Sequence, residues 1–148
     1  MNRSMFNIIL MAIALVFTSC SIDPEPLNYG KDQCDHCRMT IMDSKFGAEI
    51  ITKKGKIYKF DAAECMIRFV KEGKIGEGEV SKYLVIDASK PAQFIDAKDA
   101  VYLISENFPS PMGADLSAYG TRNNAENFQM QYSGEIKDWD GVLTKLNH

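Results

Sequence analysis

The sequence predicts an α+β fold in which two ββαβ-like units pack into one small domain. Short strand-like segments alternate with single helical segments along the chain. The segment at 46–50 also has a near copy at 112–116, an offset of 66 residues. A five-residue match carries little weight alone, but the same order of strand, helix and strand surrounds both copies. These observations together favour a duplicated unit.

The first unit is expected to contain four short strands and one helix. The strands are predicted at 46–52, 56–60, 83–87 and 101–105. A hairpin turn at 53–55 joins the first two strands. Asp61 is positioned to cap the helix, with Glu64 three residues later, and Gly73 ends it.

The second unit is expected to contain a helix, a strand and a closing helix. Their predicted ranges are 123–132, 135–139 and 142–146. Thr121 has a side chain typical of a helix N-cap, and Gly134 is placed to end the first of these helices. We therefore assign residues 34–105 to the first unit and residues 106–148 to the second.

The first 19 residues resemble a bacterial lipoprotein signal peptide. Ten consecutive apolar residues at 8–17 follow Arg3, a run too short for a membrane-spanning helix. Two small residues then precede Cys20, as in a lipobox, although Phe17 replaces the usual aliphatic residue. We expect removal of residues 1–19 and lipid attachment at Cys20. The alternative is an ordinary signal peptide that leaves this cysteine in the mature fold.

Residues 20–33 are polar, contain two prolines and predict a flexible tether between the lipid and the folded domain. The protein is thus expected on the extracytoplasmic, periplasmic side of a bacterial membrane. The formal net charge of −3 argues against a nucleic-acid partner, because such proteins present basic surfaces. No nucleophile elbow or phosphate-binding glycine loop is present, so we expect no enzymatic activity.

A sulfur-rich motif begins where the tether ends. Cys34, Cys37 and Met39 place two thiols and a thioether within six residues. Soft sulfur ligands select soft metals, and Cu(I) accepts thiolate and thioether together. With Cys37 and Met39 as two ligands, Met112 is the candidate third, because it lies between loop-forming residues rather than in a helix. The sequence therefore indicates a Cu(I) site.

The other sulfur-containing side chains are expected to pack in the interior. Cys65 lies on the first predicted helix and would be a reserve thiol only if that helix faces the motif. Met42, Met66 and Met130 are expected to fill space in the core.

Three alternatives remain for the motif. A thioredoxin-like redox pair of Cys34 and Cys37 is one, although a proline-bearing tether, rather than a strand, leads into it. Structural zinc is another, but zinc takes four ligands, and the mature chain offers three thiols and the histidines at 36 and 148. The third is a plain disulfide between Cys34 and Cys37.

The chain resembles the NosL family, the accessory lipoproteins of nitrous oxide reductase maturation. The likeness rests on Cys34-x-x-Cys37-x-Met39-x-Ile41, on Lys59-Phe60-Asp61 followed by Glu64-Cys65-Met66, and on Ser110-Pro111-Met112-Gly113-Ala114. It extends over nearly all of the mature chain, and it implies a fold of two ββαβ units.

The resemblance implies a membrane-anchored Cu(I) metallochaperone that supplies copper for the maturation of nitrous oxide reductase. Its partners would be the nitrous oxide reductase apoprotein and the associated membrane transporter complex, and a homodimer could share the metal. The implied ligands are Cys37, Met39 and Met112, with Cys34 as a further candidate. An exported thiol–disulfide exchange protein that uses Cys34 and Cys37 stays open as the alternative function.

Overall fold

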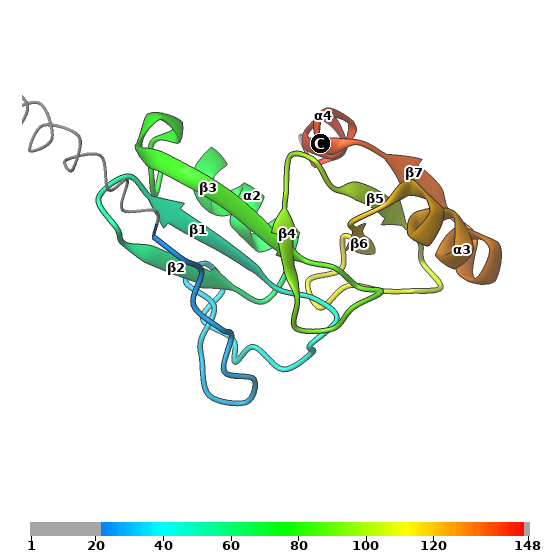
Figure 1. Ribbon diagram of the computed structural model, residues 1–148, viewed down its shortest axis with the longest axis horizontal. Helices are drawn as coiled ribbons and strands as arrows, with labels where there is room; N and C mark the ends of the chain where they lie inside the picture. Colours follow the sequence, from blue (N-terminus) through cyan, green and yellow to red (C-terminus); the bar gives the residue numbers. More distant parts are fainter. Residues whose placement is uncertain (1–21, 147–148) are drawn as a thin grey trace, which may run out of the picture.

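The computed structural model describes residues 22–146 (Figure 1). The expected signal peptide and the expected lipid-attachment residue Cys20 lie outside the described residues. Within residues 22–146, none of the helices has the length and apolar character needed to span a bilayer.

The first sheet has four antiparallel strands in the order β2-β1-β3-β4. The strands are β1 (Ala48–Thr52), β2 (Ile57–Phe60), β3 (Val80–Ile86) and β4 (Phe94–Asp96). Every residue of β1 is buried, because this strand is central in the sheet and covered on both faces. Helix α2 (Ala63–Lys71) packs on β1 and β2 through Cys65, Met66 and Phe69. A short 3₁₀ turn, η1 (Glu77–Glu79), leads into β3.

The second sheet has three antiparallel strands in the order β6-β5-β7. The strands are β5 (Val101–Ile104), β6 (Leu116–Tyr119) and β7 (Glu135–Lys137), and helix α3 (Arg122–Tyr132) packs on all three. Thr121 Oγ1 accepts a hydrogen bond from Asn124 N at 3.2 Å, so the predicted N-cap is confirmed. Helix α4 (Trp139–Lys145) closes the chain against β5 and β7.

The two sheets repeat one topology, which confirms the predicted α+β class. In each sheet the first strand is paired on both sides: the second strand pairs on one side, and the strand that follows the helix pairs on the other. In the first sheet β4 then adds to the outer side of β3. Thus β1, β2, α2 and β3 correspond to β5, β6, α3 and β7 (Figure 1). The boundary between the sheets falls between β4 and β5, whereas the sequence placed the strand at 101–105 in the first unit.

The sequence copy that suggested the repeat does not mark equivalent positions. The segment at 46–50 leads into the central strand β1, whereas the segment at 112–116 leads into the edge strand β6. The structural counterpart of β1 is β5. The order of strands and helices therefore supports the predicted repeat, whereas the five-residue sequence match does not.

One hydrophobic core runs through both sheets. It includes Ile50, Phe60 and Met66 from the first unit, and Tyr102 and Val142 from the second. A smaller cluster lies under α3. Because a shared core makes separate unfolding of the two halves costly, the chain forms one domain.

Three local predictions are wrong. The N-cap of α2 is Ala62 rather than Asp61, and Asp61 is buried beside the site described below. Met42 and Met130, expected in the core, are 69% and 80% exposed, whereas Met66 is fully buried as expected. The last helix begins at Trp139 rather than 142, because Asp138 caps it by accepting a hydrogen bond from Gly141 N at 2.9 Å.

Glu49 generates a prediction about stability and pH. Its side chain is fully buried on β1, where Oε1 accepts a hydrogen bond from Glu25 N at 3.2 Å and Oε2 has no partner among the described residues. Burial raises the pKa of this carboxyl from 4.5 to about 7. The folded protein therefore holds the Glu49 proton more tightly than the unfolded chain, so stability is lost as the pH rises from about 4.5 through about 7.

We expect urea unfolding at pH 5 and pH 8 to show a smaller pH-dependent loss of stability in Glu49→Gln than in the wild type. The difference should be about 2–3 kcal/mol, since one pKa unit corresponds to about 1.4 kcal/mol. Glu106→Gln, at an exposed position, is the matched control and should follow the wild type. Identical pH dependence in all three proteins would contradict the role assigned to Glu49.

Candidate metal centre

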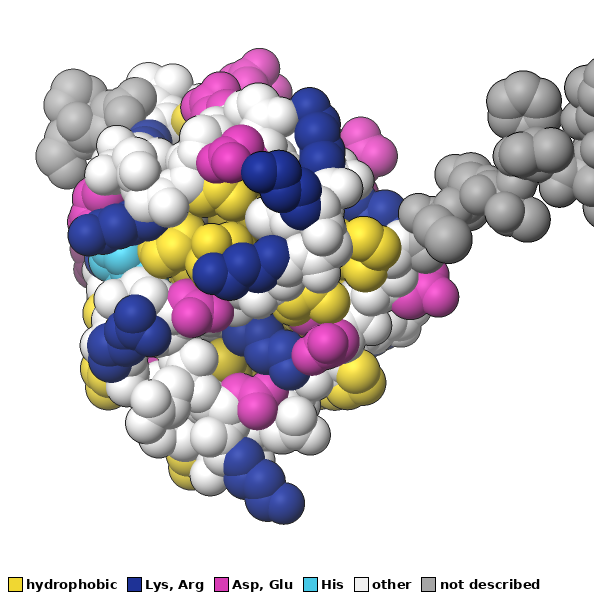
Figure 2. All heavy atoms as spheres, turned by 90° about the vertical axis from the view of Figure 1, so that its left-hand side faces the viewer, with side chains coloured by type: hydrophobic (Ala, Val, Ile, Leu, Met, Phe, Trp, Pro, Cys, Tyr) yellow, Lys and Arg dark blue, Asp and Glu magenta, His cyan; other side chains and the backbone are white. Residues whose placement is uncertain are grey.

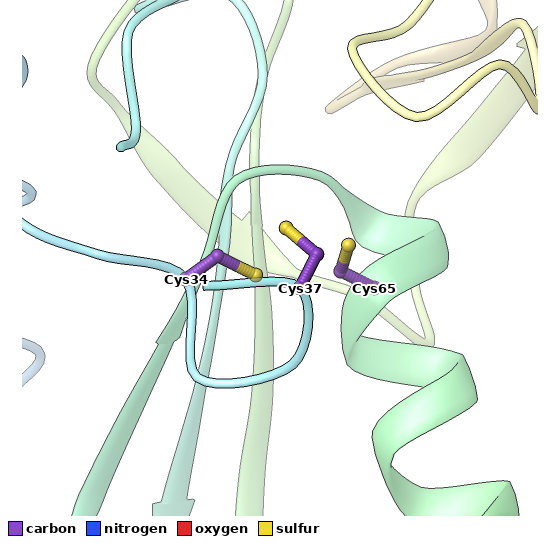
Figure 3. Close-up of side chains that lie close together, drawn as sticks. All are labelled: Cys34, Cys37 and Cys65. Atoms are coloured by element: carbon purple, nitrogen blue, oxygen red, sulfur yellow. The ribbon is translucent and has the colours of Figure 1, made fainter. Parts of the chain in front are cut away.

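Three thiols converge beside the N-terminal end of α2 (Figure 3). The Sγ atoms of Cys34, Cys37 and Cys65 all lie within 4.8 Å of one another, and all three cysteines are free. Cys34 and Cys65 are fully buried, whereas Cys37 is half-buried. We call these three residues the cysteine cluster. It joins a loop near the start of the domain to the first turn of a helix some 30 residues later in the sequence.

A tight loop brings Cys34 and Cys37 to the same side of the chain. Cys34 N donates a hydrogen bond to Met39 O at 2.8 Å, and Arg38 N donates to Cys34 O at 2.9 Å. Arg38 has a positive φ of 67°, which reverses the chain direction between the two cysteines and the strand-like bridge beyond. The cysteines are therefore held by backbone hydrogen bonds rather than by packing alone.

The same loop is fixed to the edge strand β2. Asp35 N donates to Lys59 O at 2.8 Å, and Lys59 N donates to the Oδ2 atom of Asp35 at 2.8 Å. Lys59 Nζ also lies 3.0 Å from Asp32 Oδ2 and 3.2 Å from Glu25 Oε2. Because β2 leads directly into α2, this attachment places the loop opposite Cys65.

Hydrogen bonding gives the three thiols different acidities. The Cys65 thiol donates to Cys34, and backbone N–H groups of Cys37, Asp61 and His36 add further donors. These contacts outweigh burial and lower the pKa of Cys34 from 9.0 to about 5. The same hydrogen bond raises the pKa of Cys65, while burial raises the pKa of Cys37. At neutral pH the cluster thus holds one thiolate and two protonated thiols.

Two carboxyl groups are buried in this region: Asp61 lies beside Cys34, and Glu64 directly precedes Cys65 in the chain. Burial, followed by the negative charge of Cys34, raises the pKa of Asp61 to about 6. Burial also raises the pKa of Glu64, and the hydroxyl of Ser110 donates a short hydrogen bond to Glu64 Oε1. Burial therefore disfavours the charged form of both carboxyls, and the charge of Cys34 adds to this effect at Asp61.

His36 is turned toward a different partner. Its Nε2 atom lies 3.0 Å from Glu72 Oε1, at the C-terminal end of α2. Its Nδ1 atom is buried without a hydrogen-bond partner in the described part of the chain. His36 is not in the group of ligand atoms that lie within 4.8 Å of one another.

The four predicted metal-ligand residues lie in different environments. Cys34 and Cys37 belong to the cysteine cluster. Met39 is 55% exposed and follows Cys37 at the end of the loop. Met112 is half-buried and packs on the core cluster that contains Cys34 and Cys65. Ligand roles for the two methionines stay predictions.

Sequence reasoning did not count Cys65 among the ligands. It expected a core cysteine that would be a reserve thiol only if its helix faced the motif, and the structure shows that the cysteine is buried and that its thiol does face the motif. The one signal in the sequence was the odd count of three thiols downstream of Cys20, which indicates that at least one of them is free or bound to something.

Three sulfur donors with no fourth cysteine, histidine or carboxylate in the group suit a soft ion of low coordination number. Hard cations prefer oxygen ligands, and structural zinc takes four protein ligands. Within residues 22–146 the cluster therefore fits a thiophilic, three-coordinate metal better than zinc, calcium or magnesium.

Comparisons with known proteins show the family and the fold. The NosL family model matches residues 28–146. A crystal structure described as the copper chaperone NosL from Shewanella denitrificans has the same fold, with a TM-score of 0.68 and 23% sequence identity. The match covers 81% of this chain and 95% of that chain. No curated protein matches the sequence. Because the family model covers most of the chain, the protein belongs to the NosL family.

Proposed function

We propose that the protein is a membrane-anchored metallochaperone that binds Cu(I) and supplies it for the maturation of nitrous oxide reductase. The observation that supports this most directly is the convergence of Cys34, Cys37 and Cys65 to within 4.8 Å. The NosL family membership supports the copper assignment. The proposed partners are the nitrous oxide reductase apoprotein and its membrane transporter complex.

The protonation state of the cluster suits uptake of a monovalent soft cation. The Cys34 thiolate supplies one full negative charge at neutral pH, because its pKa is about 5. Metal ligation by Cys37 or Cys65 requires loss of that thiol's proton, since the thiolate is the ligand form. Binding should therefore release protons and become tighter as the pH rises.

The sulfur side chains at the site range from buried to solvent-exposed, and this suits a copper carrier. Cys34 and Cys65 are buried, Cys37 is half-buried, and Met39 lies largely in solvent. A sulfur ligand of an acceptor protein can approach from the Cys37 and Met39 side while the buried thiols still hold the ion. Copper can then pass by exchange of one donor at a time. A site closed on every side would retain its metal.

We propose that a lipid anchor holds the carrier at the membrane. Lipid attachment at Cys20 would keep the carrier on the periplasmic side of the membrane, near a membrane-bound partner. A homodimer could add a sulfur ligand from a second copy of the chain. N-terminal mass analysis of the exported protein tests the lipid, and native mass spectrometry tests the dimer.

The cysteine cluster generates a prediction about copper affinity. In anaerobic competition titrations we expect one Cu(I) per chain and a loss of affinity of more than roughly 100-fold in Cys37→Ser and in Cys65→Ser, since even outer-shell changes cost 10–100-fold. Met66→Leu is the matched control, because Met66 is buried on the same helix one residue from Cys65. Unchanged affinity in both cysteine variants would remove the cluster as the site.

The two predicted thioether ligands need a separate experiment. We expect Met39→Leu and Met112→Leu to lower Cu(I) affinity by roughly tenfold each and to reduce the sulfur coordination number seen by X-ray absorption spectroscopy. Met130→Leu controls for the exposed residue, because Met130 is 80% exposed on α3. Equal affinity and equal coordination number in all four proteins would restrict the ligands to the three cysteines.

The arrangement of the thiols disfavours the alternative of thiol–disulfide exchange. In such proteins the low-pKa thiol is the accessible nucleophile. Here the low pKa belongs to the fully buried Cys34, and the more accessible Cys37 has a raised pKa. We therefore expect the reduced, metal-free protein to reduce a disulfide-bonded test substrate such as insulin no faster than a free thiol at the same concentration. Turnover that is lost in Cys34→Ser while copper affinity persists would instead support exchange.

A further inference from the structure

A group of lysines surrounds a hollow at one end of the first sheet. The hollow has a volume of about 300 Å³ and lies between the β1–β2 turn and the segment that leads into β3. Tyr58 and Ile75 contribute its apolar lining. The lysines that line it are Lys53, Lys54, Lys56 and Lys74, and we call this feature the lysine hollow. Figure 2 views the molecule from this side and shows basic side chains, with acidic side chains between them, around exposed apolar surface.

The lysines of the lysine hollow have no ion-pair partners among the described residues. All four lysines are exposed, and none of them takes part in an ion pair in the part of the chain that the structure describes. Lys53 Nζ donates to Gly78 O at 2.6 Å, and Lys56 Nζ lies 4.3 Å from the centroid of the Tyr58 ring. Glu79 is the one acidic residue of the lining. The lysine hollow therefore carries a net positive charge, although the chain as a whole has a formal net charge of −3.

The N-terminal segment arrives at the same end of the molecule. A Cβ atom at Gly55, in the β1–β2 turn, would lie 3.0 Å from Ile22 Cδ1. Lys82 Nζ, on the adjoining strand, donates to Ile22 O at 3.4 Å. Cys20 precedes Ile22 by two residues, and each residue spans at most about 3.6 Å. A lipid on Cys20 is therefore attached within roughly 7 Å of the Ile22 backbone.

We propose that the lysine hollow binds the anionic headgroups of phospholipids and holds the β1–β2 end of the domain against the bilayer. This inference rests on the proposed lipid anchor for its geometry. A lipid attached within roughly 7 Å of Ile22 brings the β1–β2 end of the domain to the membrane surface, where a Debye length of about 8–10 Å sets the range over which lysines attract anionic headgroups. Clustered lysines near an anionic surface bind it, and stable membrane attachment commonly combines one lipid signal with one basic patch. The half-buried Tyr58 suits the boundary between headgroups and acyl chains.

Two measurements on the exported full-length protein test this proposal. Flotation with vesicles measures membrane attachment. Acetylation with a water-soluble, amine-reactive reagent, followed by peptide mass spectrometry, measures how accessible each lysine is. Both use vesicles of phosphatidylcholine alone and vesicles that also contain phosphatidylglycerol. We expect the four lysines to react roughly threefold more slowly on the anionic vesicles, and the protection to disappear at about 1 M salt, where the Debye length is roughly 3 Å. Lys31 and Lys90, exposed elsewhere, should react equally on both.

Charge-reversal variants identify the surface responsible. The Lys54→Glu, Lys56→Glu double variant should lose the protection of Lys53 and Lys74. The Lys31→Glu, Lys90→Glu double variant changes the net charge equally and should keep it. Equal protection in both double variants, or no difference between the vesicle types in the wild type, would overturn the proposal.

The flotation result separates the lysine hollow from the lipid anchor. Flotation with phosphatidylcholine vesicles and unprotected lysines on anionic vesicles would support the anchor and overturn binding by the lysine hollow. Flotation only with anionic vesicles at low salt would support the lysine hollow and overturn the anchor. Failure to float with either kind would overturn both.

Discussion

The site depends on one constraint, the attachment of the loop at 34–39 to the edge of β2. Two hydrogen bonds between Asp35 and Lys59, one from backbone to backbone and one from backbone to the Asp35 carboxylate, hold the loop against the first sheet. They place Cys34 where backbone N–H groups and the Cys65 thiol can stabilise its thiolate. Without this attachment the loop that carries Cys34 and Cys37 would lose its hydrogen bonds to the first sheet, and Cys65 would be an ordinary buried cysteine. The chemistry of the cluster is thus a consequence of the hydrogen bonds between the loop and β2.

The sequence predicted the fold class and most elements because their signals are local. Alternating apolar residues, the turn at 53–55 and the Thr121 cap each act over a few residues, and the structure contains the elements they indicate. The assignment of β5 could not be made in this way. The residue pattern of a strand at 101–104 is the same whichever sheet the strand joins. Its pairing with β6 and β7 is decided by tertiary contacts.

The site was predictable only in part, because one of its cysteines is brought to it by tertiary packing rather than by local spacing. Cys34 and Cys37 are three residues apart, so their proximity follows from the sequence. Cys65 reaches them through the packing of α2, which no spacing rule reveals. Asp61 shows the same limit, because its place before the helix suggested a cap, whereas it is buried beside Cys34. Residues near a functional site often depart from local rules in this way.

The hydrogen bond from Ser110 to Glu64 crosses from the second unit to the first. Glu64 directly precedes Cys65 in the chain, and Ser110 lies two residues before Met112. A displacement of the 110–112 loop therefore pulls on the helical turn that carries a thiol of the cluster. The two halves of the fold are joined at this point by a buried hydrogen bond, so movement of the loop that carries Met112 is coupled to the helical turn that carries Cys65.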